Sequence, residues 1–339
     1  MDVLGRTGGD DTGQYADLGQ YLATDRSLGA PVGFDVSGPH AGVVVGKRGS
    51  GKSYTLGVLA EGLAEARGVA PVVVDPMGAF RGLEAVGVDV CEPLVRADAL
   101  PPRAWCDLLD LAPASPAGTL VWRAAAETTT LDAMRDWVAD APAGGDARRA
   151  AANHLALADT WGCFAADAPL PRSLLGAGAV LDCTRLQGAA LQAVVAAVAT
   201  DLYQAALDGA PRLPWLLVDE AHACASGAAA DAVSTLYTRG RAPGASVVLA
   251  TQRPSALPDV AVSQSDLVVA HRLTSAADVD ALAATRPTYL TGTVADRLPA
   301  RTGDALVVDD ATETACTVCV RERRTEHGGG STAPLPAPQ

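Results

Sequence analysis

The chain has 339 residues, 49% of them hydrophobic, which is enough to bury a large core and excludes general disorder. Its length allows two domains or one α/β domain with an insertion. It carries 30 Asp and 9 Glu against 24 Arg and only two Lys, for a net charge of −13. This balance disfavours a generic DNA binder with a broadly basic surface, although it leaves room for a locally basic pore.

The excess of Asp and the near absence of Lys are typical of a protein kept soluble at very high salt by an acidic surface. A GC-rich genome would also replace Lys with Arg, and that alternative stays open. Residues 1–11 lack the basic and apolar regions of a signal peptide. No run reaches about 18 uninterrupted apolar residues, so we expect no membrane-spanning helix. The longest approach, Ala189–Thr200, contains Gln192 and suits a packed helix.

In chain order, residues 1–38 are rich in Gly and Asp, show few strand signals, and predict a strap over the core. Short apolar runs then recur, bounded by Gly, Pro or charge. They rarely alternate with polar residues, which predicts strands covered on both faces, as in a parallel sheet. These runs are Gly42–Val45, Val72–Val74, Ala179–Leu181, Trp215–Val218, Ser246–Ala250, Leu267–Ala270 and Ala305–Val308.

Helical patterns lie between several of these runs, at Ser53–Ala66, Gln187–Leu207 and Ala230–Arg239, and the alternation predicts a doubly wound α/β fold. Residues of about 95–170 break the rhythm and predict a helical insertion of two to four helices, with a loop at Ala141–Gly145. Residues 326–339, with three consecutive glycines and then a Pro-rich stretch, predict a disordered tail. The main domain is therefore expected over 39–325.

The seven cysteines are odd in number and lie mostly in apolar runs, which favours reduced thiols in a cytoplasm. Cys316 and Cys319 form a CxxC, but they fall in the expected strand Thr314–Val320. No second Cys or His pair stands near them in the sequence, so a zinc or redox role is disfavoured.

The strongest motif follows the first predicted core strand and opens an apolar-periodic helix. It is a full match to GxxxxGK[ST], the phosphate-binding P-loop, with the sequence Gly46-Lys47-Arg48-Gly49-Ser50-Gly51-Lys52-Ser53. The loop's N–H groups and the helix N-terminus would surround phosphate oxygens. Lys52 would neutralise phosphate charge and Ser53 would bind Mg²⁺. A structural Gly-rich turn would not require one of the chain's two lysines at this position.

A second motif ends the strand that contains Leu217 and Val218. Asp219 is the candidate Mg²⁺ ligand, and Glu220 the candidate general base for the attacking water. Both would lie at the carboxyl end of the sheet, where α/β proteins bind ligands. In the alternative interpretation, the acidic pair only satisfies the dipole of the following helix.

Two further positions are weaker candidates on spacing alone. Gln252, at the end of a predicted strand, could sense the γ-phosphate or be an ordinary loop residue. Arg241, just after a predicted helix, could reach a neighbouring subunit's γ-phosphate or lie in solvent at the helix end. Arg239 and Arg253 are its rivals for that role.

Together these residues resemble the HerA branch of the HerA/FtsK ATPases, over roughly residues 39–330. The resemblance includes Gly46–Gly57 with Tyr54, the turn at Asp75–Gly78, the run at 217–222, and Gly240-Arg241 before Ala250–Pro254. It continues through His271-Arg272-Leu273-Thr274 and the segment Arg321–Gly329.

The resemblance implies a RecA-like P-loop NTPase fold with a mostly parallel sheet flanked by helices, here with a helical insertion. It also implies a homo-oligomeric, hexameric ring that hydrolyses Mg-ATP, moves on double-stranded DNA, and works with a NurA-type nuclease in DNA end processing. By position, Gly46 to Tyr54 would bind ATP, Ser53 and Asp219 would hold Mg²⁺, and Glu220, Gln252 and Arg241 would be the catalytic base, sensor and arginine finger. With the salt-adapted composition, an archaeal, haloarchaeal member is expected.

Two departures from the family pattern keep alternatives open. Members commonly open with a β-barrel domain, which about 40 residues cannot hold. Ala79 stands where an acidic residue often follows the Asp-x-x-Gly turn, so we assign that loop no catalytic part. A related ring motor for plasmid transfer or viral genome packaging, or a nucleotide-gated assembly factor, are the competing hypotheses.

The salt-adapted interpretation makes a measurable prediction. An acidic surface repels itself at low ionic strength and is screened by added salt, so the melting temperature should rise strongly between about 0.1 M and 3 M KCl. Circular dichroism melts at the two concentrations provide the measurement. Equal melting temperatures would leave genomic base composition as the explanation for the missing lysines.

Overall fold

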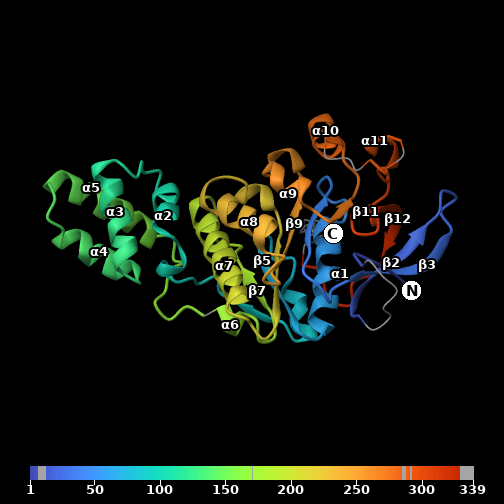
Figure 1. The fold of residues 1–339 in the computed structure, drawn as a ribbon, viewed down its shortest axis with the longest axis horizontal. Helices are drawn as coiled ribbons and strands as arrows, with labels where there is room; N and C mark the ends of the chain where they lie inside the picture. The colour runs from blue at the N-terminus through green and yellow to red at the C-terminus, as the bar shows by residue number, and fades with distance from the viewer. Residues whose placement is uncertain (7–12, 170, 285–287, 291, 329–339) are drawn as a thin grey trace, which may run out of the picture.

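The computed structural model describes residues 1–6, 13–169, 171–284, 288–290 and 292–328 (Figure 1). Its centre is a twelve-stranded mixed sheet in the order β1-β3-β2-β12-β11-β10-β4-β9-β8-β5-β7-β6. The parallel part consists of β4 (Ala41–Val45), β5 (Val69–Asp75), β6 (Asp89–Cys91), β7 (Ala179–Asp182), β8 (Leu213–Val218), β9 (Ser246–Thr251) and β10 (Leu267–Ala270). The predicted strands in this region are confirmed.

Both faces of the parallel strands are buried, which is why their apolar runs do not alternate. On β4, Val43 and Val45 pack toward α7 (Ala189–Leu207) and α8 (Gly227–Arg239), whereas Val44 packs toward α1 (Lys52–Glu65). Helix α7 is long and apolar enough to cross a membrane, but 67% of its most apolar window is buried inside the protein, as expected of a core helix.

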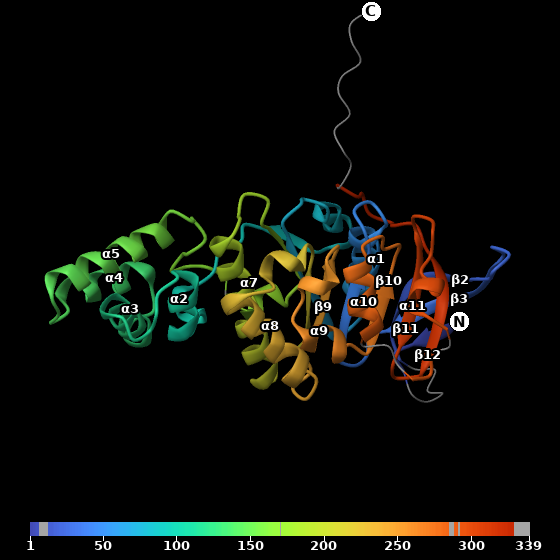
Figure 2. The same cartoon turned by 90° about the horizontal axis from the view of Figure 1, so that it is seen from above.

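The remaining strands extend the sheet beyond β10. Strands β11 (Asp304–Asp309), β12 (Thr314–Val320), β2 (Tyr15–Leu22) and β3 (Leu28–Asp35) pair antiparallel in turn, and β1 (Asp2–Leu4) pairs parallel with β3. Short helices α9 (Asp259–Ser263), α10 (Ala276–Ala284) and α11 (Val294–Arg297) lie near β10 and β11 (Figure 2).

The expectation of few strands in residues 1–38 is wrong, because three strands of the sheet lie there. The glycines that resemble loop residues are needed for close packing. A Cβ on Gly19 would lie 2.1 Å from the carbonyl oxygen of Cys319 on β12, and one on Gly33 would lie 2.9 Å from the ring of Tyr15. The segment is therefore part of the sheet and not a strap across it.

The predicted insertion is helical. It contains α2 (Pro102–Leu108), α3 (Pro116–Glu127), α4 (Leu131–Asp140) and α5 (Gly145–Asp159), followed by α6 (Pro171–Leu174). Leu131, Met134 and Val138 are buried at helical spacing on α4, and Thr130 caps that helix by accepting from the N–H of Ala133. Helices α3–α5 lie beyond the sheet at one end of the molecule (Figures 1 and 2).

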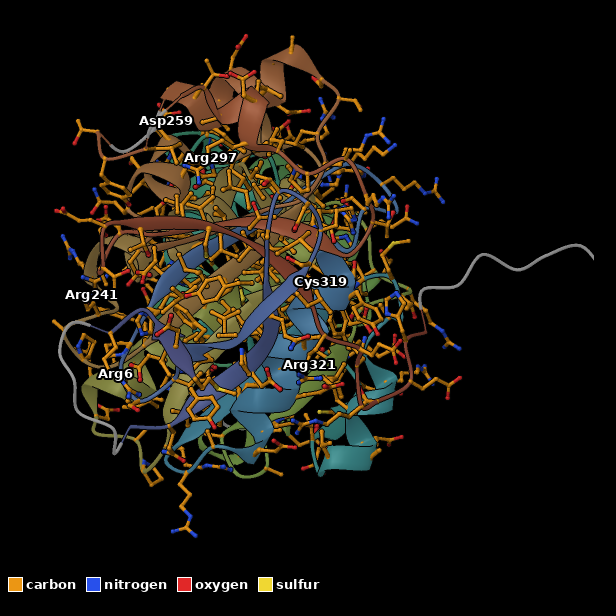
Figure 3. All side chains as sticks on the ribbon, turned by 90° about the vertical axis from the view of Figure 1, so that its right-hand side faces the viewer. Arg6, Arg241, Asp259, Arg297, Cys319 and Arg321 are labelled. Atoms are coloured by element: carbon orange, nitrogen blue, oxygen red, sulfur yellow. The ribbon has the colours of Figure 1, made fainter. Side chains whose placement is uncertain are left out.

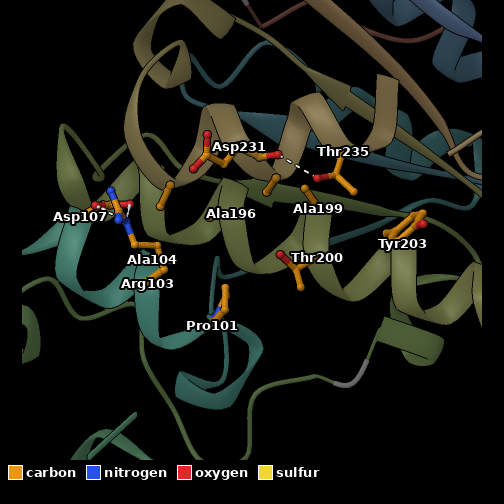
Figure 4. Close-up of a pocket in the computed structure, with 12 residues that line it drawn as sticks. Pro101, Arg103, Ala104, Asp107, Ala196, Ala199, Thr200, Tyr203, Asp231 and Thr235 are labelled. Atoms are coloured by element: carbon orange, nitrogen blue, oxygen red, sulfur yellow. Dashed lines mark hydrogen bonds and ion pairs between the residues drawn. The ribbon is translucent and has the colours of Figure 1, made fainter. Parts of the chain in front are cut away.

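Helix α2 joins the insertion to the main domain. A cavity of about 260 Å³ lies where α2 meets α7 and α8, lined largely by small side chains such as Ala104, Ala196 and Ala199 (Figure 4). None of its lining residues belongs to the cavity at the P-loop.

The predicted tail spans both described and undescribed residues. Residues 326–328 pack beside the P-loop helix, and the remainder, 329–339, lies outside the described residues. Because β1–β3 belong to the same sheet as β4–β12, the expected boundary at residue 39 does not separate two units of the fold, and the boundary at 325 stays a prediction.

Candidate nucleotide-binding site

The P-loop connects β4 to α1 at the carboxyl edge of the sheet. Its first amide N–H, that of Gly46, donates to the carbonyl of Thr251 at the end of β9 (3.3 Å), and that of Lys47 donates to the carbonyl of Arg272 (2.7 Å). Gly51, the residue before α1, has φ 119°, which favours glycine. These contacts tie the predicted phosphate-binding loop to the strands on either side of β4.

Lys52 lies at the start of α1 and is nearly fully buried. Its Nζ is 3.4 Å from the carbonyl oxygen of Lys47. Burial lowers the pKa of Lys52, and the charges of Glu220 and Asp219 oppose that change. A desolvated ammonium aimed into a cavity would gain strongly from an anionic ligand.

Asp219 follows β8, and β9 separates it from β4 in the sheet. One carboxylate oxygen, Oδ1, accepts from the N–H of Glu220 (3.0 Å). The other, Oδ2, is buried and makes no hydrogen bond within the described residues. Burial raises the pKa of Asp219 to about 6, against the opposing effect of the nearby Ser53 hydroxyl. An orphaned buried carboxylate oxygen beside a hydroxyl fits Mg²⁺, which uses one or two protein oxygens together with phosphate and water.

Glu220 and Gln252, the candidate base and sensor, contact each other. The amide Nε2 of Gln252 donates to Oε2 of Glu220 at 3.3 Å. The backbone of Glu220 has φ 50° and ψ 38°, a left-handed conformation that is unusual for residues other than Gly, Asn or Asp. Such a backbone persists where its surroundings fix it, and here it follows the buried Asp219 directly.

Two histidines in this site were given no role by the sequence. Nδ1 of His222 lies 3.2 Å from Oε2 of Glu220 and 3.4 Å from the hydroxyl of Thr251, so His222 can orient the glutamate. His271 is fully buried behind the P-loop. It contacts the hydroxyl of Thr55 through Nε2 (2.8 Å) and the carbonyl of Asp304 through Nδ1 (2.8 Å).

Burial lowers the pKa of His271 to about 4, so its ring is neutral at neutral pH. Since a carbonyl can only accept, Nδ1 carries the proton and Nε2 accepts from Thr55. His271 therefore links α1 to the loop after β10. The only sequence signal for it was its place in the family resemblance.

The loop after β5, to which the sequence assigned no catalytic part, is shaped by Asp75, and its Met77 and Ala79 line the cavity at the P-loop. The carboxylate of Asp75 accepts from the N–H groups of Met77 (3.2 Å), Ala79 (3.0 Å) and Phe80 (2.9 Å). Its oxygens are thus occupied in shaping the turn. No group of three or more His, Cys, Asp or Glu side chains in the described part of the chain could hold a metal ion, and all seven cysteines are free thiols.

Arg241 lies near the amino ends of β4 and β10, whereas the P-loop of the same chain follows the carboxyl end of β4. Its guanidinium is mostly exposed and pairs with Asp266 (2.5 Å), which precedes β10 and accepts from the N–H of Ala41 at the start of β4. Asp266 also contacts Nδ1 of His40 (3.0 Å). Figure 3 shows Arg241 on the same side as Arg6, away from Arg321. The structure does not bring Arg241 to the other site residues, and its role as a finger in a neighbouring subunit stays a prediction.

A cavity of about 570 Å³ opens in front of the P-loop. The P-loop and the catalytic edge contribute Arg48, Lys52, Ser53 and Glu220 to its lining. Tyr54 lines the same cavity from α1, and Gly303, His327 and Gly328 line it from the C-terminal part of the chain. The fold is that of a RecA-like P-loop NTPase, which confirms the predicted fold class.

Comparisons with known proteins agree with this assignment. Residues 17–142 match the family described as "Helicase HerA, central domain". The match begins within β2, so it includes part of the expected strap. No curated protein sequence matches the chain.

Two of the solved structures with similar folds illustrate the likeness. VirB4 of Thermoanaerobacter pseudethanolicus is 14% identical, with 94% of this chain and 99% of that chain covered and a TM-score of 0.70. The bacterial conjugative coupling protein TrwB, in a form with sulphate, is 18% identical, with 85% and 87% covered and a TM-score of 0.58. The two structures show the fold of the chain, and the family match adds a likeness to HerA over residues 17–142.

Asp219→Asn tests the electrostatics of the site. Near pH 3 the Asp219 carboxyl of the parent is protonated in both the folded and the unfolded protein. Between its unfolded pKa of about 4 and its folded pKa of about 6, the unfolded protein releases this proton more readily, so the free energy of unfolding falls as the pH rises. The neutral amide avoids that loss. The variant should therefore be more stable than the parent at pH 7.5, by on the order of 3 kcal/mol, with the difference shrinking toward pH 4.

Chemical denaturation at both pH values in molar KCl provides this measurement. Asp136→Asn, at an exposed position on α4, is the matched control, and its free energy of unfolding should equal that of the parent at both pH values. A parent as stable as Asp219→Asn at pH 7.5 would show that the buried carboxylate is not destabilising.

Proposed function

We propose that the protein is a HerA-type, ATP-driven motor that hydrolyses Mg-ATP at the interfaces of a homo-oligomeric, hexameric ring and translocates on double-stranded DNA. The observation that carries the proposal is the meeting of Lys52, Asp219 and the Glu220–Gln252 pair at one sheet edge. The family match over residues 17–142 supports the HerA type. A cytoplasmic location and a NurA-type nuclease as partner in DNA end processing complete the proposal.

The residues of the site divide the chemistry among them. Lys52 and N–H groups of the P-loop bind the β- and γ-phosphates, since Lys52 is positive and lines the cavity together with the loop residues Gly49 and Gly51. Ser53 and Asp219 would hold Mg²⁺, which when bound neutralises phosphate charge. Glu220 accepts a proton from the attacking water, and Gln252, which donates to Glu220, detects the change in charge at the γ-phosphate.

A second candidate is a related motor for plasmid transfer. The observation in its favour is the fold similarity to the conjugative coupling protein TrwB, beside the longer match to VirB4. Both candidates require ATP hydrolysis that rises when duplex DNA is added in molar KCl. An assembly factor that only binds nucleotide would show no such increase.

Glu220→Gln is the sharpest test of the catalytic assignment. The amide keeps an oxygen that can accept from Gln252 but cannot take a proton, so Mg-ATP should still bind while turnover falls by about 10² to 10⁴. Equilibrium binding and a phosphate-release assay measure the two effects. Lys52→Ala is the contrasting variant and should lose binding as well. Loss of ATP affinity in a folded Glu220→Gln protein would make Glu220 a ligand and not a base.

Arg241→Ala tests the ring. Asp266 keeps His40 and the Ala41 N–H as partners, so the fold should tolerate the change. An arginine finger is worth about 10³ to 10⁵ in rate, so the variant should bind ATP and hydrolyse it slowly. Because a head-to-tail interface joins different surfaces, mixing it with Lys52→Ala should restore part of the activity.

Arg239→Ala and Arg253→Ala belong in the same experiment as rival fingers. Full turnover by Arg241→Ala alone would assign the finger to another residue. Mixed oligomers that form without recovering activity would show that the subunits do not share sites.

A further inference from the structure

The segment after β12, residues 321–328, is held against α1 by one buried glutamate. Glu61 is fully buried on α1, and its Oε1 accepts from the N–H groups of Arg324 (3.0 Å) and Thr325 (2.9 Å) and from the Thr325 hydroxyl (2.7 Å). Its Oε2 accepts from Nη1 of Arg321 at 2.7 Å. With both oxygens engaged, the glutamate fixes the path of the segment relative to the P-loop helix.

Close packing at glycines restricts that path further. A Cβ on Gly57 of α1 would lie 2.6 Å from the guanidinium carbon of Arg323, and one on Gly82 would lie 2.3 Å from the carbonyl oxygen of Glu326. The Arg323 side chain is 1% exposed and donates to the carbonyl of Ala79 (3.1 Å). The segment consequently has little freedom before it reaches the cavity.

His327 is the aromatic residue that this path brings to the cavity. Its Nδ1 lies 3.1 Å from Nη1 of Arg323, and since a guanidinium can only donate, Nδ1 is an acceptor. Burial and the charge of Arg323 lower the pKa of His327, which favours the neutral ring that the acceptor role of Nδ1 requires. The ring centroid lies 5.6 Å from that of Tyr54, with the planes 73° apart.

We propose that His327, together with Tyr54, contacts the base of the bound nucleotide. Tyr54 directly follows Ser53, and both aromatic residues line the cavity into which Lys52 faces. The P-loop itself recognises only phosphates, so affinity for the rest of the nucleotide must come from elsewhere in this cavity. Aromatic side chains bind the flat rings of nucleotide bases by stacking, whichever base is present. This inference rests on the proposed nucleotide binding and adds the residues that distinguish a nucleotide from bare triphosphate.

The alternative is that the segment only stabilises α1. In that case, removing the His327 ring would affect ATP and inorganic triphosphate equally, through the shape of the P-loop. A base contact would affect ATP alone, because inorganic triphosphate has no base. Comparing the two ligands therefore separates the two roles.

The experiment is calorimetric titration of the full chain with ATP and with inorganic triphosphate, both with Mg²⁺ in molar KCl. His327→Ala should weaken ATP binding about 10-fold and leave triphosphate binding unchanged. His327→Phe keeps an aromatic face and should recover most of the lost affinity. His154→Ala, on α5 in the insertion, is the matched histidine control and should bind both ligands as the parent does.

The outcomes separate this inference from the proposed function. ATP affinity unchanged in His327→Ala, or lowered equally with triphosphate affinity, would overturn the base contact while nucleotide binding stands. Failure of the parent to bind either ligand would instead overturn the proposed function. ATP binding that weakens alone and recovers in His327→Phe supports the base contact.

Discussion

Covering both faces of a parallel sheet leaves only its ends for chemistry, and the site depends on that constraint. Helix α1 covers one face and α7 and α8 cover the other, so side chains from different strands meet only where the strands end. The carboxyl ends of β4, β8 and β9 supply the P-loop, the Asp219–Glu220 pair and Gln252. The amino ends supply a charge cluster around Asp266 that contacts none of them.

Two buried carboxylates differ in whether the fold supplies their hydrogen-bond partners, and this difference distinguishes a structural residue from a candidate site residue. Glu61 has both of its oxygens engaged by the segment after β12, so its burial is offset by hydrogen bonds within the fold. Asp219 has one oxygen without a partner among the described residues, and Lys52 is desolvated beside it. Such unpaired groups lower stability unless a ligand completes them.

The sequence predicted best what depends on local pattern. The apolar runs of the parallel strands, the P-loop and the period of α4 need only their own residues to be recognised. It failed at β2 and β3, where Gly19 and Gly33 permit close contacts that no local pattern reveals. It could not place His222, His271 or His327 in roles, because each also contacts a residue distant in sequence, such as Thr251, Thr55 and Tyr54 respectively. The position of Arg241 likewise follows from strand order.

The order of the strands also has consequences during synthesis. β2 pairs with β3 on one side and with β12 on the other. One edge of the β2–β3 hairpin therefore stays unpaired until β12, near the end of the chain, has been synthesised. The same is true of Glu61, whose partners are more than 250 residues away. Contacts of such long range form slowly and leave strand edges exposed to other chains. A nascent chain that stalls before residue 314 would thus lack β12, so the edge of β2 would be unpaired. Glu61 on α1 would then be exposed to water without its partners.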